Sequence, residues 1–165
     1  MYTGDGKGKT TAALGLCIRA AGAGLRVYIA QFMKKGDYSE FKALERFQDQ
    51  IRVEQFGTGR FVGNQPQPDD LASAGIGMAA AEKALTSGRF DLVVLDEANV
   101  AAARGLIEIE RLLDLIRSRP AGVELVLTGR GADPRILDAA DLVTEMRAVR
   151  HYYDDGVEAR TGIEK

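Results

Sequence analysis

The residues nearest the start of the chain have the types and spacing that bind a polyphosphate. They precede an Ala- and Leu-rich stretch, and they read Gly4, Asp5, Gly6, Lys7, Gly8, Lys9, Thr10 and Thr11. Glycines let backbone N–H groups converge on an anion, and a helix N-terminus, a lysine and a hydroxyl complete such a site. We predict that this loop binds a nucleoside triphosphate and that Lys9 is an exposed catalytic lysine. A glycine-rich turn with solvated lysines is the alternative.

The glycine spacing differs from that of the common phosphate loop, which is written G-x-x-x-x-G-K-[ST]. The place of its first glycine is held here by Thr3, and Gly4 stands one place later. The loop is therefore one residue short between its first glycine and Gly8.

A second motif supplies carboxylates. An apolar run at 92–95 is followed directly by Asp96 and Glu97, and open parallel sheets bind their ligands at the carboxyl ends of such strands. Mg²⁺ prefers hard oxygen ligands, so we predict a magnesium site formed by Thr10, Asp96 and Glu97, with Glu97 also catalytic. The alternative is that Asp96 caps a following helix and Glu97 is solvated.

Two arginines and one cysteine complete the candidates. Arg130 lies in a Thr-Gly-Arg-Gly turn after another apolar run, where it would contact phosphate or substrate, or else bond a carboxylate or helix-end carbonyls. Arg19 follows Lys9 in the first predicted helix; we include it among the ATP-binding candidates, although helix-surface arginines are more often solvated. Cys17 lies on an apolar helix face and is predicted to pack in the core.

Apolar periodicity and Gly or Pro punctuation predict alternating strands and helices. The predicted strands are 26–32, 51–56, 92–95, 123–128 and 142–146, and the predicted helices are 10–23, 39–47, 69 or 70 to 87 (capped by Asp69 or Asp70), 107–117 and 134–140. Only residues 1–3 remain for a strand before the phosphate loop, and 57–68 form a long Gly- and Pro-rich loop. This alternation predicts a mostly parallel sheet flanked by helices, in a single α/β domain over residues 1–165 of the phosphate-loop NTPase, RecA-like type.

Composition limits the classes of function. The 22 Lys and Arg residues against 24 Asp and Glu give a formal net charge of -2, which provides no general attraction to nucleic acid or to anionic membranes. One cysteine excludes an internal disulfide and a cysteine metal cluster, as expected of a protein of the reducing cytoplasm. No apolar run has the length of a membrane span.

Several segments together resemble one family, the ATP:corrinoid adenosyltransferases of cobalamin biosynthesis. The matching pieces are the short phosphate loop at 4–13, Gln31-Phe32, and the segments 94–97, 127–131, 141–147 and 162–164. These pieces cover nearly the whole chain, and the shortened loop and the Thr-Gly-Arg-Gly turn are the most specific of them.

The resemblance implies that the protein transfers the 5′-deoxyadenosyl group of ATP to Co(I) of a corrinoid, with Mg²⁺, and releases triphosphate. It also implies a homodimer and a flavoprotein or other reductase that supplies Co(I). Arg60, Phe61, Val62 and Arg130 are the corrinoid-binding candidates. Family members commonly have bulky aromatic residues in this loop, and here the chain has no tryptophan and offers Phe61.

Two other functions fit the motifs. A generic phosphate-loop ATPase or kinase would use Glu97 to polarise water for attack on the γ-phosphate. A carrier or regulatory subunit would bind ATP and corrinoid without turnover.

Overall fold

Parallel strands form the centre of the molecule in a computed structural model that describes residues 1–63 and 65–164. The main sheet has the order β3-β2-β4-β5, with β2 (Val27–Phe32), β3 (Ile51–Phe56), β4 (Leu92–Asp96) and β5 (Glu124–Leu127). The short β1 (Tyr2–Thr3) pairs in parallel with β6 (Thr144–Glu145), and a bridge between Tyr2 and Thr128 places β1 beside the end of β5. The carboxyl ends of all these strands therefore meet along one edge.

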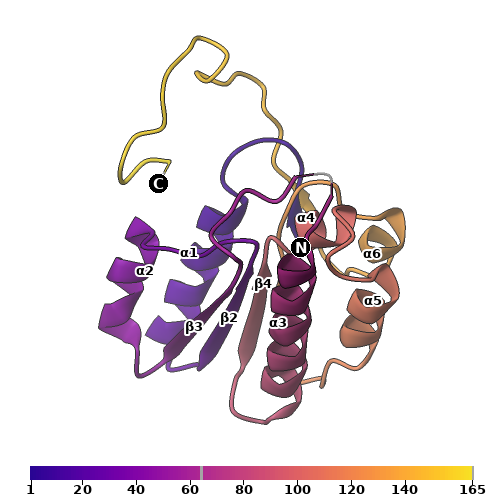
Figure 1. The fold of residues 1–165 in the computed structure, drawn as a ribbon. Helices are drawn as coiled ribbons and strands as arrows, with labels where there is room; N and C mark the ends of the chain where they lie inside the picture. The colour runs from indigo at the N-terminus through magenta and orange to yellow at the C-terminus, as the bar shows by residue number, and fades with distance from the viewer. Residues whose placement is uncertain (64, 165) are drawn as a thin grey trace.

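Helices cover both faces of this sheet (Figure 1). One face contacts α1 (Lys9–Gly22) and α2 (Ser39–Leu44), which continues into a 3₁₀ turn, η1 (Glu45–Phe47). The other contacts α3 (Pro68–Thr86), α4 (Ala98–Ala103), α5 (Ile109–Arg117) and α6 (Pro134–Asp138). None of the helices in the described residues is long and apolar enough to cross a membrane.

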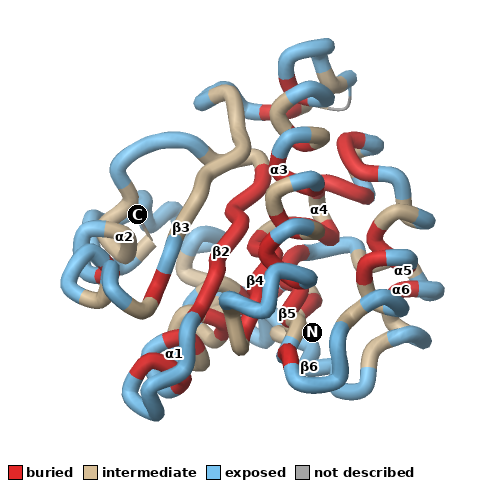
Figure 2. The backbone as a smooth tube through the Cα atoms, turned by 90° about the horizontal axis from the view of Figure 1, so that it is seen from below, coloured by how far each residue is buried: buried red, intermediate tan, exposed pale blue. Residues whose placement is uncertain are grey.

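The alternation of side chains along β2 divides the core in two. Tyr28, Ala30 and Phe32 point into the cluster that contains α3, whereas Val27 and Ile29 point into the cluster under α1. Every residue of β2 is buried, so this strand is the continuous red segment at the centre of Figure 2. Strands covered on both faces lose the polar alternation of a half-exposed strand, which explains the apolar runs in the sequence.

Cys17 packs in the core beneath α1, as predicted. Its side chain is fully buried, and burial raises the pKa of the thiol to about 12, so the sulfur behaves as a small apolar group.

The alternating pattern and the mostly parallel sheet are confirmed, but several local predictions are wrong. Helix α4 follows directly on β4 and was not predicted, because six residues rich in alanine carry little periodicity. Helix α3 begins one residue before Asp69, and Gln67 is its cap: the Gln67 N–H donates to the Asp70 carboxylate at 3.0 Å. The last predicted strand is reduced to the two residues of β6.

Gly77 sets how closely α3 approaches the sheet. A Cβ at this position would lie 2.7 Å from Phe32 Cε1 and 2.7 Å from Phe56 Cγ, two atoms of rings that are already packed against each other. Gly75, one half-turn earlier on the same helix, has no heavy atom within 4 Å of such a Cβ.

We predict opposite effects for alanine at these two positions. Gly77→Ala should lower the free energy of unfolding by about 1–3 kcal/mol because it overpacks the core. Gly75→Ala should raise it by about 0.5–1 kcal/mol because alanine favours the helix. Urea unfolding of both variants measures this, and equal stabilities would show that α3 is not held at this distance by its glycine.

Candidate functional site

The loop between β1 and α1 is shaped by residues from the far end of the sequence. The Gly6 N–H donates to the Met146 carbonyl at 2.7 Å, and the Met146 N–H donates to the Thr3 carbonyl at 2.8 Å. Gly4 has φ 90°, and a Cβ there would lie 2.6 Å from the Met146 carbonyl oxygen. Gly8 has φ 111° and caps α1. Two of these glycines thus adopt a backbone that residues with a Cβ rarely take, and the loop is held closely against β6.

The Lys9 side chain is folded onto this loop. Its ammonium donates to the carbonyls of Gly4 at 2.6 Å and Gly6 at 2.7 Å, and the residue is only 8% exposed. Burial, with a smaller contribution from Arg130, lowers the pKa of Lys9. The expectation of an exposed lysine is therefore wrong, because the Lys9 ammonium bonds to carbonyls of its own loop.

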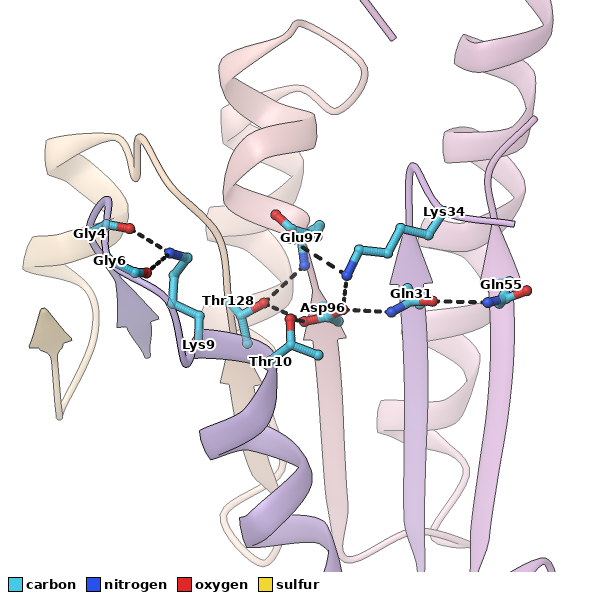
Figure 3. A network of polar contacts seen from close by, with 10 residues as sticks. All are labelled: Gly4, Gly6, Lys9, Thr10, Gln31, Lys34, Gln55, Asp96, Glu97 and Thr128. Atoms are coloured by element: carbon cyan, nitrogen blue, oxygen red, sulfur yellow. Dashed lines mark hydrogen bonds and ion pairs between the residues drawn. The ribbon is translucent and has the colours of Figure 1, made fainter. Parts of the chain in front are cut away.

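Asp96 is the centre of a buried polar network at the carboxyl ends of the strands (Figure 3). Its Oδ1 accepts from the hydroxyls of Thr10 at 2.8 Å and Thr128 at 2.7 Å. Its Oδ2 accepts from Gln31 Nε2 at 2.8 Å, and Gln31 in turn accepts from Gln55 Nε2 at 3.0 Å. The network joins α1, β5, β2 and β3 to β4. The alternative in which Asp96 caps the next helix is wrong.

Glu97 stands at the start of α4 in the left-handed backbone region, with φ 61°. Its carboxylate lies 3.8 Å from Lys34 Nζ, which also lies 3.4 Å from Asp96 Oδ2. Burial raises the pKa of Glu97, and the negative charge of Asp96 adds to this effect. For Lys34, the Asp96 and Glu97 carboxylates outweigh an opposing effect of burial and raise the pKa.

Lys9, Lys34 and Glu97 line one cavity of about 700 Å³. Its walls include most of the predicted phosphate and metal residues: Gly6, Lys7, Gly8, Lys9, Thr10, Thr11, Glu97 and Arg130. Gly4 does not line the cavity, but its carbonyl accepts from Lys9. Asp5 is exposed and does not line the cavity either. Arg19 is exposed near the last turn of α1 and does not line the cavity. The structure therefore does not bring Arg19 together with the phosphate loop.

The C-terminal segment completes the wall of this cavity. In Figure 1 it rises from the sheet edge and returns over the loop between β1 and α1, and Gly162, Ile163 and Glu164 line the cavity. Lys7 Nζ lies 3.0 Å from the Glu164 carboxylate, which also accepts from Arg160. These donors, Arg160 first, hold the pKa of Glu164 well below its usual value.

Of the four residues predicted to contact a corrinoid, Arg130 lines the cavity, whereas Arg60, Phe61 and Val62 lie on the loop after β3. The Phe61 side chain is 90% exposed, and Arg60 lies 3.5 Å from Asp70 at the start of α3. Val62 is only 5% exposed and packs in the core, with its carbonyl accepting from Arg104 at 3.2 Å. The Val62 side chain therefore offers no surface to a ligand in this structure. Residue 64 of the same loop lies outside the described residues.

Sequence reasoning missed Lys34 as a member of this site. It lies two residues after the end of β2, at the same edge where β4 ends in Asp96 and Glu97 follows. The signal that identified the two carboxylates, a polar residue at the carboxyl end of an apolar strand, applies equally to Lys34.

Comparison with known proteins agrees with this geometry. The family model described as ATP:corrinoid adenosyltransferase BtuR/CobO/CobP matches residues 1–164. The corrinoid adenosyltransferase of Pseudomonas aeruginosa is 38% identical, over 99% of this chain and 81% of the relative. That of Escherichia coli K12 is 36% identical, over 99% of this chain and 83% of the relative. With a family match over nearly every residue and relatives of this similarity, the chain belongs to the ATP:corrinoid adenosyltransferase family.

Proposed function

We propose that this protein transfers the 5′-deoxyadenosyl group of ATP to Co(I) of a reduced corrinoid and releases inorganic triphosphate. One observation carries the proposal beyond family membership. The phosphate loop, the Thr10 hydroxyl, the Glu97 carboxylate and the cation of Lys34 face a single cavity at the carboxyl edge of a parallel sheet. We further propose that residues 1–165 form one phosphate-loop domain of the RecA-like type, since a loop between β1 and α1 and carboxylates after β4 meet at this edge.

The reaction requires little acid–base chemistry from the protein. The cobalt lone pair attacks the 5′ carbon, a cobalt–carbon bond forms, and the bond from that carbon to oxygen breaks with its electrons going to triphosphate. The protein must orient the 5′ carbon, stabilise charge on the leaving group and exclude water. A buried lysine, backbone N–H groups and a helix N-terminus suit the second task.

The residues present fit a magnesium ion. The Thr10 hydroxyl and the Glu97 carboxylate are hard oxygen donors on the wall of the same cavity. Asp96 already accepts three hydrogen bonds of 2.7 to 2.8 Å, so we assign it the positioning of Thr10 rather than a direct bond to the metal. Bound Mg²⁺ would supply positive charge to the departing triphosphate.

Phosphate and corrinoid contacts are assigned by exposure and position. Lys9 and Arg130 line the cavity and would bind phosphate oxygens, with Lys9 leaving the loop carbonyls to do so. Phe61 and Arg60, on the exposed loop after β3, would contact the corrin ring, whereas the buried Val62 is left out of this surface.

Two partners belong to the proposal. Because the nucleophile is Co(I), a flavoprotein or other reductase must reduce the cobalt before transfer. The homodimer implied by the resemblance is tested by light scattering of the purified chain.

The function is tested with ATP, Mg²⁺ and chemically reduced cobalamin. We expect a product whose cobalt–carbon absorbance is lost on illumination, together with one triphosphate for each adenosyl group transferred. ADP and phosphate formed without corrinoid would instead identify an ATPase. Binding of both ligands with no spectral change would identify a carrier.

Lys9→Ala serves as the disabled control in this assay. Losing a charge-assisted contact to the leaving group should slow transfer on the order of 10²-fold or more. Lys83→Ala, at an exposed lysine of α3 outside the cavity, should retain wild-type activity.

We predict that replacing the two adjacent carboxylates by amides affects different properties of the protein. Glu97→Gln should weaken Mg²⁺ roughly 10- to 100-fold, measured as the Mg²⁺ concentration that half-saturates transfer. Asp96→Asn should lower the free energy of unfolding by about 1–3 kcal/mol because its amide NH₂ faces buried donors. If Asp96→Asn instead weakened Mg²⁺ and Glu97→Gln lowered the free energy of unfolding, the two roles would be exchanged.

We predict that Phe61→Ala slows reaction from Co(II) with a reductase more than reaction from preformed Co(I). Burying this exposed ring on a flat macrocycle contributes roughly 1.5–3 kcal/mol, enough to favour cobalt without its lower ligand and so to ease reduction. Ile76→Ala, at an exposed apolar residue of α3, is the control. Equal losses in the two assays would assign cobalt coordination to another group.

A further inference from the structure

Two backbone features fix Lys34 at the rim of the cavity. The preceding residue, Met33, has φ 62°, a left-handed conformation that disfavours residues with a Cβ. Gly57 packs so tightly against Lys34 that a Cβ would lie 2.6 Å from both its N and its O atoms. Met33 N–H also donates to the Phe56 carbonyl at 3.0 Å. The backbone of Lys34 is therefore held where β2 and β3 end.

The side chain of Lys34 extends across this edge toward Asp96 and Glu97 (Figure 3). Its distances of 3.4 Å and 3.8 Å exceed the roughly 2.7–2.9 Å of a good charge-assisted hydrogen bond. Asp96 has three closer donors, so its hydrogen-bonding capacity does not require Lys34. What Lys34 adds to the pair of carboxylates is positive charge.

The other lysines of the cavity have different partners. Lys9 is bonded to carbonyls of its own loop, and Lys7 is paired with Glu164. Lys34 alone among these three is paired with Glu97, the carboxylate assigned to Mg²⁺. A cation that binds Glu97 therefore competes with the ammonium of Lys34.

We infer, on the basis of the proposed function, that Lys34 is a triphosphate-binding residue which Asp96 and Glu97 hold in place until the nucleotide and its metal arrive. A divalent cation held by Glu97 would repel the ammonium of Lys34, and phosphate oxygens bound in the same cavity would attract it. Lys34 exchanges one anionic partner for another. The pair of carboxylates, buried Asp96 and half-buried Glu97, would have a positive charge beside it in both states, from Lys34 in one and from the metal in the other.

The first test measures binding of inorganic triphosphate by calorimetry, with Mg²⁺ and without corrinoid. Lys34→Met should weaken this binding about tenfold or more, because one charged contact is lost. Lys35→Met removes the next lysine, which is exposed and does not line the cavity, and should bind as the wild type does. Lys34→Gln repeats the measurement with a variant that can still donate to Asp96, should Lys34→Met unfold.

The second test combines Lys34→Met with Glu97→Gln. Releasing Lys34 from Glu97 should strengthen metal-free triphosphate binding in the single variant Glu97→Gln, and this gain should disappear when Lys34 is also replaced. A simple change of net charge would give the same gain in both backgrounds, because the two effects would then add.

The outcomes separate this inference from the proposed function. Wild-type affinity in Lys34→Met, or an equal gain from Glu97→Gln in the two backgrounds, would overturn the role of Lys34 while leaving adenosyl transfer untouched. Failure of the wild-type protein to bind triphosphate at all would overturn both.

Discussion

A buried carboxylate must be surrounded by donors, and in this protein that requirement organises the carboxyl edge of the sheet. Asp96 is only 2% exposed, and its carboxylate accepts hydrogen bonds from a hydroxyl of α1, a hydroxyl at the end of β5 and an amide of β2. An unpaired charge at this depth would cost several kcal/mol, so each donor is held where Asp96 needs it. The position of the Thr10 hydroxyl in the phosphate loop is thereby coupled to three strands of the sheet.

Strain at neighbouring strand ends accompanies this arrangement. Met33 and Glu97 are the two residues other than glycine with positive φ in the described part of the chain, and each directly follows a strand of the adjacent pair β2 and β4. Such conformations cost on the order of 1 kcal/mol or more. They turn the chain so that Lys34 and Glu97 face each other across the strand ends. Regular strand geometry would not bring these two opposite charges together.

What the sequence could predict was local. A few neighbouring residues are enough to recognise the glycines and Lys-Thr of the loop, and likewise the apolar run before Asp96 and Glu97. The same is true of most strands and helices. The different surroundings of Asp96 and Glu97 depend on Gln31 and Thr128, which bond to Asp96 and are remote in sequence. The burial of Val62 and the inward turn of Lys9 likewise depend on tertiary partners, and alanine-rich α4 leaves almost no periodic trace.

The pairing of β1 with β6 has a consequence for how the protein is made. The contacts that shape the loop between β1 and α1 join residues far apart in the sequence: Gly6 and Thr3 bond to Met146, 140 and 143 positions away. At about 5–20 residues per second, the ribosome delivers the second partner on the order of ten seconds after the first. This loop, although synthesised before its partners in β6, acquires its shape only after they have been made. A nascent chain therefore forms the wall of the cavity only after residues 144–146 have left the ribosome.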